Sequence, residues 1–111
     1  MEKIVLQESY VTDLRKRTIT SFIDICILKE LEQETGISPY NVMLLIHKKF
    51  GVLISPGTVY STVYSLERRG LVECKQNHGK AAYLLTEKGK EMLEDLKKAK
   101  SELHVLWATL F

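Results

Sequence analysis

The sequence predicts a mainly α-helical domain of the α+β class, in which one two-stranded hairpin precedes the last helix. Glycine and proline are few, six and two among 111 residues, and they divide the chain into long segments with helical apolar spacing. One pair of short β-compatible runs, separated by a polar stretch, follows the third of these segments. These observations give the order helix, helix, helix, hairpin, helix.

Size and composition narrow the class of protein. With 111 residues, 45% of them apolar, the chain is expected to form one soluble domain. The charged share of 27% argues against a membrane-spanning protein, so a cytoplasmic location without a membrane partner is expected. Cys26 and Cys74 are too few for a disulfide framework and are expected to be reduced and packed. A redox role is the alternative if the two thiols approach in space.

The net charge of +2 is unevenly distributed along the chain. Residues 18–36 contain one lysine and four acidic residues, whereas residues 37–85 contain six basic residues and only two acidic ones. A basic segment of this kind suits a polyanionic partner such as nucleic acid.

The first predicted helix runs from about residue 18 to residue 35, after an N-terminal extension at residues 1–17 whose role the sequence leaves open. Its acidic residues are expected to face water, and its broad apolar face should make it the central packing helix. That face contains Phe22, Ile23, Cys26, Ile27 and Leu31.

Two serine-proline pairs mark the starts of the second and third helices. Ser38 and Ser55 are suited to cap a helix N-terminus, and the proline that follows each one tolerates the first helical position. Gly51 and Gly70 mark the two ends, because glycine readily takes the left-handed conformation that closes a helix. The two helices, at about residues 39–50 and 56–69, predict a helix-turn-helix.

The hairpin is predicted from residues 71–75 and 81–85, and Thr86 is suited to cap the last helix. Residues 18–85 then have the element order of a winged helix-turn-helix domain whose two-stranded hairpin is the wing. Residues 86–111 form the predicted C-terminal dimerisation helix.

Apolar residues recur along the last helix at alternating spacings of 4 and 3 residues, which is typical of a helix that packs along a second helix. The partner is either the same helix of a second copy or the protein's own first helix. An amphipathic helix at the end of a small domain favours the second copy, and hence a homodimer. The predicted dimerisation residues are Met92, Leu96, Ala99, Leu103, Leu106, Trp107 and Leu110.

The third helix and the hairpin carry the residues expected to bind DNA. One face of the helix has core spacing, while the rest is rich in hydroxyls and arginine, which bond to base edges and phosphates. The hairpin adds cations that suit a wing near phosphates or a minor groove. The expected contacts are Thr58, Tyr60, Ser61, Thr62, Ser65, Arg68 and Arg69 on the helix, and Lys75, His78 and Lys80 on the hairpin.

Each of these residues also has a purely structural interpretation. The polar stripe of the third helix could be a solvated face, and Lys80 a solvated turn residue. Tyr60 and Tyr64 could pack against the hairpin or the dimerisation helix. Further basic residues at 15–17 and 48–49 could contact phosphates, although solvated charges explain them equally well.

Enzymatic and metal-binding interpretations find no support in the sequence. The chain contains no glycine-rich phosphate loop and no Gly-x-Ser-x-Gly elbow. His47, His78 and His104 have no partner ligand at metal-binding spacing. We therefore expect no catalytic site, no metal and no cofactor.

Three segments resemble the PadR-type transcriptional regulators, within a match that spans about residues 14–93. They are Ser-Pro-Gly-Thr-Val-Tyr at 55–60, Leu-Glu-Arg-Arg-Gly-Leu-Val at 66–72, and Gly-Lys-Ala-Ala-Tyr-Leu-Leu-Thr-Glu-Lys-Gly at 79–89. The chain departs from the family pattern at Ser61, where many members have proline, and at Ala81 and Ala82, which replace a more basic wing strand.

The resemblance implies a homodimer that binds operator DNA, usually as a repressor. The third helix would enter the major groove, with Tyr60 at the DNA backbone and Lys80 as the basic residue of the wing. The resemblance also implies that Trp107 packs between subunits or lines a space for an apolar molecule, and any effector is unknown.

Together, these expectations predict a dimeric regulator that binds double-stranded DNA at an inverted repeat. The main alternative is a winged helix that binds another protein and not DNA. A second alternative is a DNA-binding regulator that responds to a ligand or to redox state.

Overall fold

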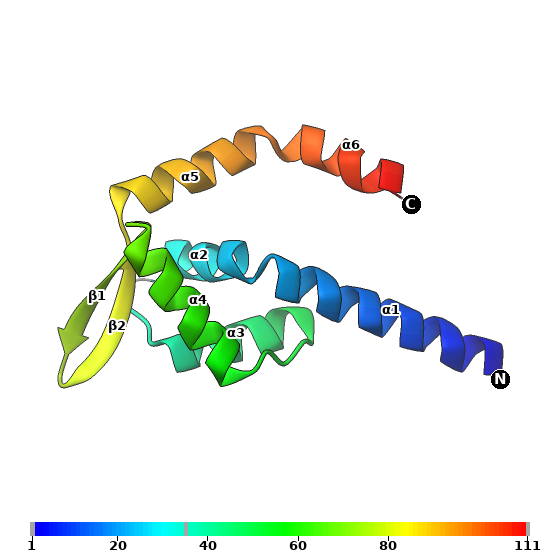
Figure 1. The fold of residues 1–111 in the computed structure, drawn as a ribbon, viewed down its shortest axis with the longest axis horizontal. Coiled ribbons are helices and arrows are strands. Elements are labelled where there is room, and N and C mark those ends of the chain that lie inside the picture. Colours follow the sequence, from blue (N-terminus) through cyan, green and yellow to red (C-terminus); the bar gives the residue numbers. More distant parts are fainter. Residues whose placement is uncertain (1, 35, 111) are drawn as a thin grey trace.

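The computed structural model describes residues 2–34 and 36–110, with side chains described for residues 9–34, 36–76 and 78–110. Within these ranges the chain forms six helices and one two-stranded antiparallel sheet (Figure 1). The α+β winged-helix fold expected from the sequence is therefore confirmed. The elements are α1 (Glu2–Ser21), α2 (Ile23–Gln33), α3 (Pro39–Phe50), α4 (Pro56–Arg68), β1 (Val72–Asn77), β2 (Lys80–Leu85), α5 (Glu87–Lys98) and α6 (Lys100–Leu110).

Capping hydrogen bonds mark the starts of α3 and α4 and the end of α4. The hydroxyl of Ser38 accepts a hydrogen bond from the Asn41 amide, and that of Ser55 accepts one from the Thr58 amide. Both expected N-caps are therefore confirmed. After α4, the amides of Gly70 and Leu71 donate to the carbonyls of Glu67 and Leu66, which closes the helix with a Schellman motif.

The hairpin extends further toward its tip than the sequence suggested. Residues 72–77 pair with residues 80–85, so only His78 and Gly79 form the turn. Both have positive φ, 53° and 78°, which is the type I′ geometry that matches the twist of a two-residue hairpin. Ile37, which precedes α3, adds an isolated bridge to Tyr83 on β2, a pairing that the sequence did not reveal.

The core lies where α2, α3, α4 and the hairpin meet, and α5 covers it. Its fully buried members come from every one of these elements and include Ile27, Ile46, Val63, Val72 and Leu93. Helix α2 contacts α3, α4, β2 and α5, so it is the central packing helix, as expected.

The predicted start of the first helix, at about residue 18, is wrong. Helix α1 runs through residue 18, and the bend before α2 falls at Phe22, which is 49% exposed and not part of the core. Backbone hydrogen bonds from Phe22 to Thr18 and from Cys26 to Phe22 continue across the bend. The change of direction lets α2 enter the core while α1 leaves it, and no glycine or proline marks this place in the sequence.

Two further expectations about helices are corrected. Glu30 on α2 is 5% exposed, not facing water, because it lies between α2 and α3 and pairs with Lys49 at 3.6 Å. The last helix is divided at Ala99, whose φ of −86° and ψ of 4° leave the helical region. Since the Ala99 amide still bonds to Asp95 and its carbonyl to Leu103, the helix bends there and does not unwind.

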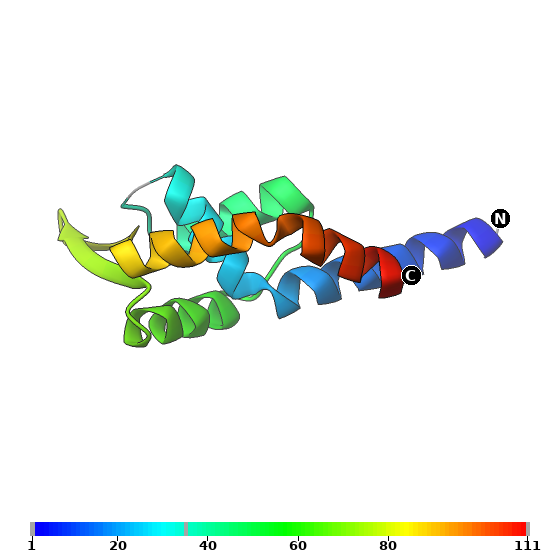
Figure 2. The ribbon, with the colours of Figure 1, turned by 90° about the horizontal axis from the view of Figure 1, so that it is seen from above.

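The molecule is elongated, with the hairpin at one end and both chain termini toward the other (Figures 1 and 2). In both views α5–α6 and α2–α1 extend lengthwise beside each other, from the hairpin end toward the end with the termini. In the part of the chain that is described, no helix is both long enough and apolar enough to cross a membrane.

Candidate nucleic-acid interface

Helix α4 divides into a buried face and an outward polar face. Val59, Val63 and Leu66 are at most 1% exposed and hold the helix against the core. On the opposite side, Ser61, Tyr64 and Arg68 are exposed, and their spacing of 3 and 4 residues aligns them along the helix. These exposed side chains form the outward row and can contact a polar surface or groove, because no other part of α4 covers them.

Three of the hydroxyl residues expected at DNA flank the outward row, where they are half-buried. They are Thr58, Thr62 and Ser65. The Thr62 hydroxyl donates to the Thr58 carbonyl at 2.7 Å, and the Thr58 hydroxyl lies 2.8 Å from that of Ser55. These internal bonds orient the hydroxyls while leaving oxygen lone pairs able to accept further bonds.

Tyr60 lies beside Tyr64, on one flank of the outward row. Their ring centroids are 6.2 Å apart and tilted by 58°. Tyr60 is half-buried, whereas Tyr64 is 45% exposed, so the Tyr64 side chain is not buried against the hairpin. Tyr64 therefore belongs to the candidate interface although it was not among the expected contacts. Its helical position, three residues after Ser61 and four before Arg68, was the signal that could have identified it.

The basic residues of the hairpin face solvent. Lys75, His78 and Lys80 are all exposed, with His78 at the turn. Behind them, Tyr83 is buried against β1, and burial together with the nearby Glu67 carboxylate raises the pKa of Tyr83 to about 12. The hairpin therefore has one buried, uncharged side, which contains Tyr83, and one exposed side, which carries Lys75 and Lys80.

Three other basic residues lie in three different environments. Arg69 follows the end of α4 and lines a hollow beside α5 with Leu71 and Lys88, so it does not continue the outward row. Lys49 is engaged with Glu30. Lys16 on α1 borders the hollow that also contains Ser55 and Thr58, close to the N-terminus of α4.

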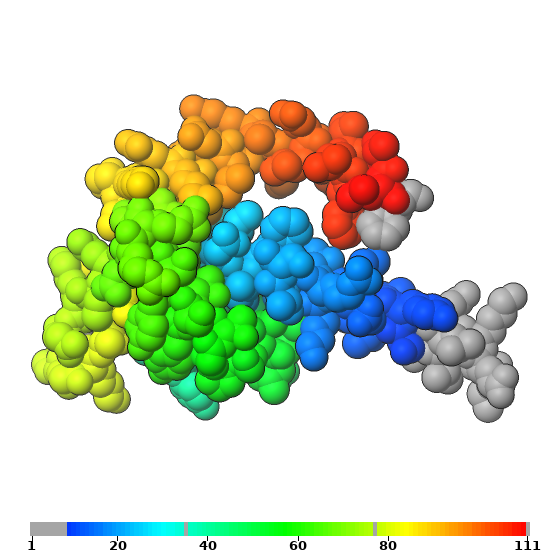
Figure 3. Space-filling model, in the orientation of Figure 1, coloured from blue at the N-terminus to red at the C-terminus, as the bar shows by residue number. Residues whose placement is uncertain are grey.

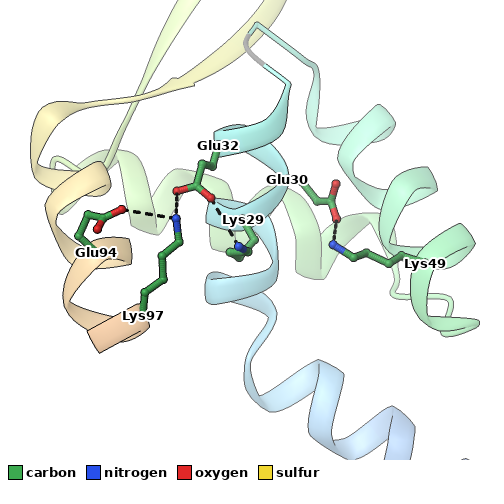
Figure 4. Close-up of polar contacts among 6 residues, drawn as sticks. All are labelled: Lys29, Glu30, Glu32, Lys49, Glu94 and Lys97. Atoms are coloured by element: carbon green, nitrogen blue, oxygen red, sulfur yellow. Dashed lines mark hydrogen bonds and ion pairs between the residues drawn. The ribbon is translucent and has the colours of Figure 1, made fainter. Parts of the chain in front are cut away.

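One ion pair, Lys97–Glu32, joins α5 to α2, and the two pairs beside it each lie within a single helix (Figure 4). Lys97 lies 2.9 Å from Glu32 and 3.5 Å from Glu94, and Lys29 lies 3.4 Å from Glu32. The hydrogen bond from Lys97 lowers the pKa of Glu32, and the same bond raises the pKa of Lys97. Because both side chains are partly exposed, this pair adds only a small contribution to the packing of α5 against α2.

The expected dimerisation residues divide at Ala99. Met92 and Leu96 pack against the core of their own chain and are half-buried, as is Ala99. Beyond the bend, Leu103, Leu106, Trp107 and Leu110 are 44–68% exposed. Leu96, Leu103 and Trp107 also line a hollow between α2 and the C-terminal helices, visible as the open space beside α6 in Figure 3.

The two thiols lie on different elements, Cys26 on α2 and Cys74 on β1, and neither is in a disulfide. Burial, with the nearby carboxylates of Asp24 and Glu30, raises the pKa of Cys26, which lowers its reactivity at neutral pH. Among the residues that the structure describes, no group of three His, Cys, Asp or Glu is placed to hold a metal ion.

The chain was compared with protein families and with proteins of known sequence and structure. Residues 12–96 match the model of a family described as EarA-like. No curated protein is significantly similar to the chain in sequence.

Solved structures with a similar fold include proteins described as transcriptional regulators. A regulator from Thermoplasma acidophilum has 26% identity and a TM-score of 0.67, over 86% of this chain and 94% of its own. The SSV1 protein F-93 has 28% identity and a TM-score of 0.59, over 75% of this chain and 90% of its own. A PadR-like regulator from Bacillus cereus has 23% identity and a TM-score of 0.69, over 85% of this chain and 95% of its own. The resemblance to the PadR-type fold is thus confirmed.

Proposed function

Because the chain belongs to the EarA-like family and shares its fold with transcriptional regulators, we propose that it is a dimeric, sequence-specific DNA-binding regulator of transcription. It would act in the cytoplasm, as a repressor that occupies a promoter. Neither a cofactor nor a catalytic step is part of this function.

The observation that carries the proposal is the outward face of α4. Ser61, Tyr64 and Arg68 form an exposed row on a helix whose opposite side is fully buried. Small hydroxyls permit close approach to a major groove, and arginine can form two parallel bonds to guanine or to phosphate. The exposed Lys75 and Lys80 place positive charge on the wing beside this helix, where phosphates or a minor groove would lie.

The proposed dimer supplies the second half of the DNA site. The seam of the last helix leaves Leu103, Leu106, Trp107 and Leu110 exposed in the single chain, and a second copy packed along it would bury them. Two recognition helices related by twofold symmetry would enter successive major grooves, about 34 Å apart, on an inverted repeat.

Charge removal at the interface tests the proposal. Arg68→Ala and Lys80→Ala should each weaken binding to the selected duplex and reduce the slope of log affinity against log salt, by about one for each phosphate that the variant no longer binds. Substitutions of Ser61 or Thr62 should change sequence preference more than salt dependence. Lys90→Ala, which removes an exposed cation from α5, is the matched control and should leave binding unchanged. Unchanged operator affinity in all four interface variants would refute the assignment.

A protein-interaction module is the second candidate, and the exposed apolar side of α6 favours it. In that case α6 would bind a different protein, and the purified chain would select no DNA. A regulator that responds to a ligand or to redox state stays within the first proposal, and effector-dependent DNA affinity would identify it.

A further inference from the structure

Five of the six glycines have a structural reason to be glycine. Gly89 lies in the first turn of α5, and a side chain there would overlap the carbonyl oxygen of Leu71. The other four have φ between 69° and 78°, where other residues are strained. These four are Gly36, Gly51, Gly70 and Gly79.

Gly57, in the first turn of α4, has neither reason. It is exposed and helical, its φ lies outside the left-handed region, and a Cβ built on it would meet no atom of the described chain within 4 Å. Glycine within a helix is destabilising relative to alanine because its backbone loses more freedom on folding. The fold of the single chain therefore gives no advantage to glycine at this position.

Helix α3 shows that a large side chain is accepted at the equivalent position. Both helices begin with a capping serine and a proline at the first helical position. The next residue is Tyr40 in α3 and Gly57 in α4, and Tyr40 is 53% exposed. Neither the capping arrangement nor the packing of the single chain therefore explains glycine at residue 57.

Gly57 lies on the same face of α4 as the proposed DNA contacts. Residues 57, 61, 64 and 68 are spaced by 4, 3 and 4, so Gly57 extends the outward row of Ser61, Tyr64 and Arg68 to the amino end of α4. The amino end of a helix attracts anions, because its amide groups and the helix dipole present positive charge. A DNA strand fits both the polar row and this charge.

We propose that the sugar-phosphate backbone of the DNA passes in van der Waals contact with the Cα of Gly57, so that the missing side chain sets how deeply α4 enters the groove. This inference rests on the proposed DNA-binding function. Gly57 is thus a positioning residue, whose contribution is the space it leaves and not a bond it makes.

The test separates stability from binding in one pair of variants. Gly57→Ala should raise the melting temperature of the free protein by roughly 2–6 °C, because alanine restricts the unfolded chain. The same variant should bind the selected duplex about tenfold more weakly, because its methyl group overlaps the DNA strand. Gly57→Leu should weaken binding further. Lys90→Leu, which places the same side chain at an exposed position of α5, is the control and should bind like the wild type.

Two outcomes would overturn the inference, and only the second would also overturn the proposed DNA-binding function. If the wild type binds the duplex and both Gly57 variants bind it as tightly, this inference alone fails. If the wild-type protein selects no duplex at all, the proposed function fails together with it.

Discussion

Leu106→Ala probes the proposed dimer seam. Leu106 is 58% exposed in the single chain, so a second copy could bury more than half of it. Complete burial of a leucine side chain is worth about 1.5–3 kcal/mol, and 58% of that is about 0.9–1.7 kcal/mol for each copy. A symmetric dimer loses this amount twice, about 2–3.5 kcal/mol, which should weaken dimerisation by about 30- to 300-fold.

Sedimentation velocity over a concentration series measures this change directly. Ser101→Ala is the matched control, since Ser101 is exposed on the same helix but off the apolar seam. Circular dichroism should show unchanged helix content for both variants, because Leu106 is outside the core of its own chain. A dimer dissociation constant that is the same for Leu106→Ala and for wild type would refute the seam as the contact between copies.

Three other perturbations test the fold and its electrostatics. Gly89→Ala should lower the free energy of unfolding by about 1–3 kcal/mol in urea titrations, because the new methyl group overlaps the Leu71 carbonyl; an unchanged midpoint would contradict this packing. Lys97 lowers the pKa of Glu32, so the pair stabilises the protein above the ordinary glutamate range, about pH 4.3, and this stabilisation is lost as the pH falls through the lower native pKa. The stability difference between wild type and Glu32→Gln should therefore be present at pH 7 and absent at pH 2, and a constant difference would exclude the ion pair as its cause. Cys26 should be alkylated at pH 7.5 at least about tenfold more slowly in the native than in the unfolded protein, as followed by peptide mass spectrometry, and equal rates would show that its thiol is not protected.

Sequence reasoning succeeded where structure is determined by neighbouring residues. The caps at Ser38, Ser55 and Thr86 act over three residues, and the bounds of α3 and the start of α4 followed from them. The Schellman closure after Gly70 is likewise local. The wing was found from composition, although its pairing to the tip depended on His78 taking a positive φ, which its residue type did not indicate.

Sequence reasoning failed where tertiary packing decides. The bends at Phe22 and Ala99 keep their backbone hydrogen bonds and contain no glycine or proline, so only the surrounding helices reveal them. The burial of Glu30 depends on Lys49 from another helix. For the candidate site, the composition of α4 identified the polar stripe, but Tyr64 was missed although its spacing from Ser61 and Arg68 places it on the outward row.

The central proposal, a dimer that reads a specific DNA sequence, is tested most directly by selection from a random duplex library with the purified full chain at moderate salt. The mass of the selected complex is measured in the same experiment. The predicted result is an enriched palindrome whose half-sites lie about one helical turn apart, bound by two chains. No enrichment above that given by a basic competitor protein would contradict sequence-specific DNA binding, and an enriched site bound by one chain would contradict the dimer.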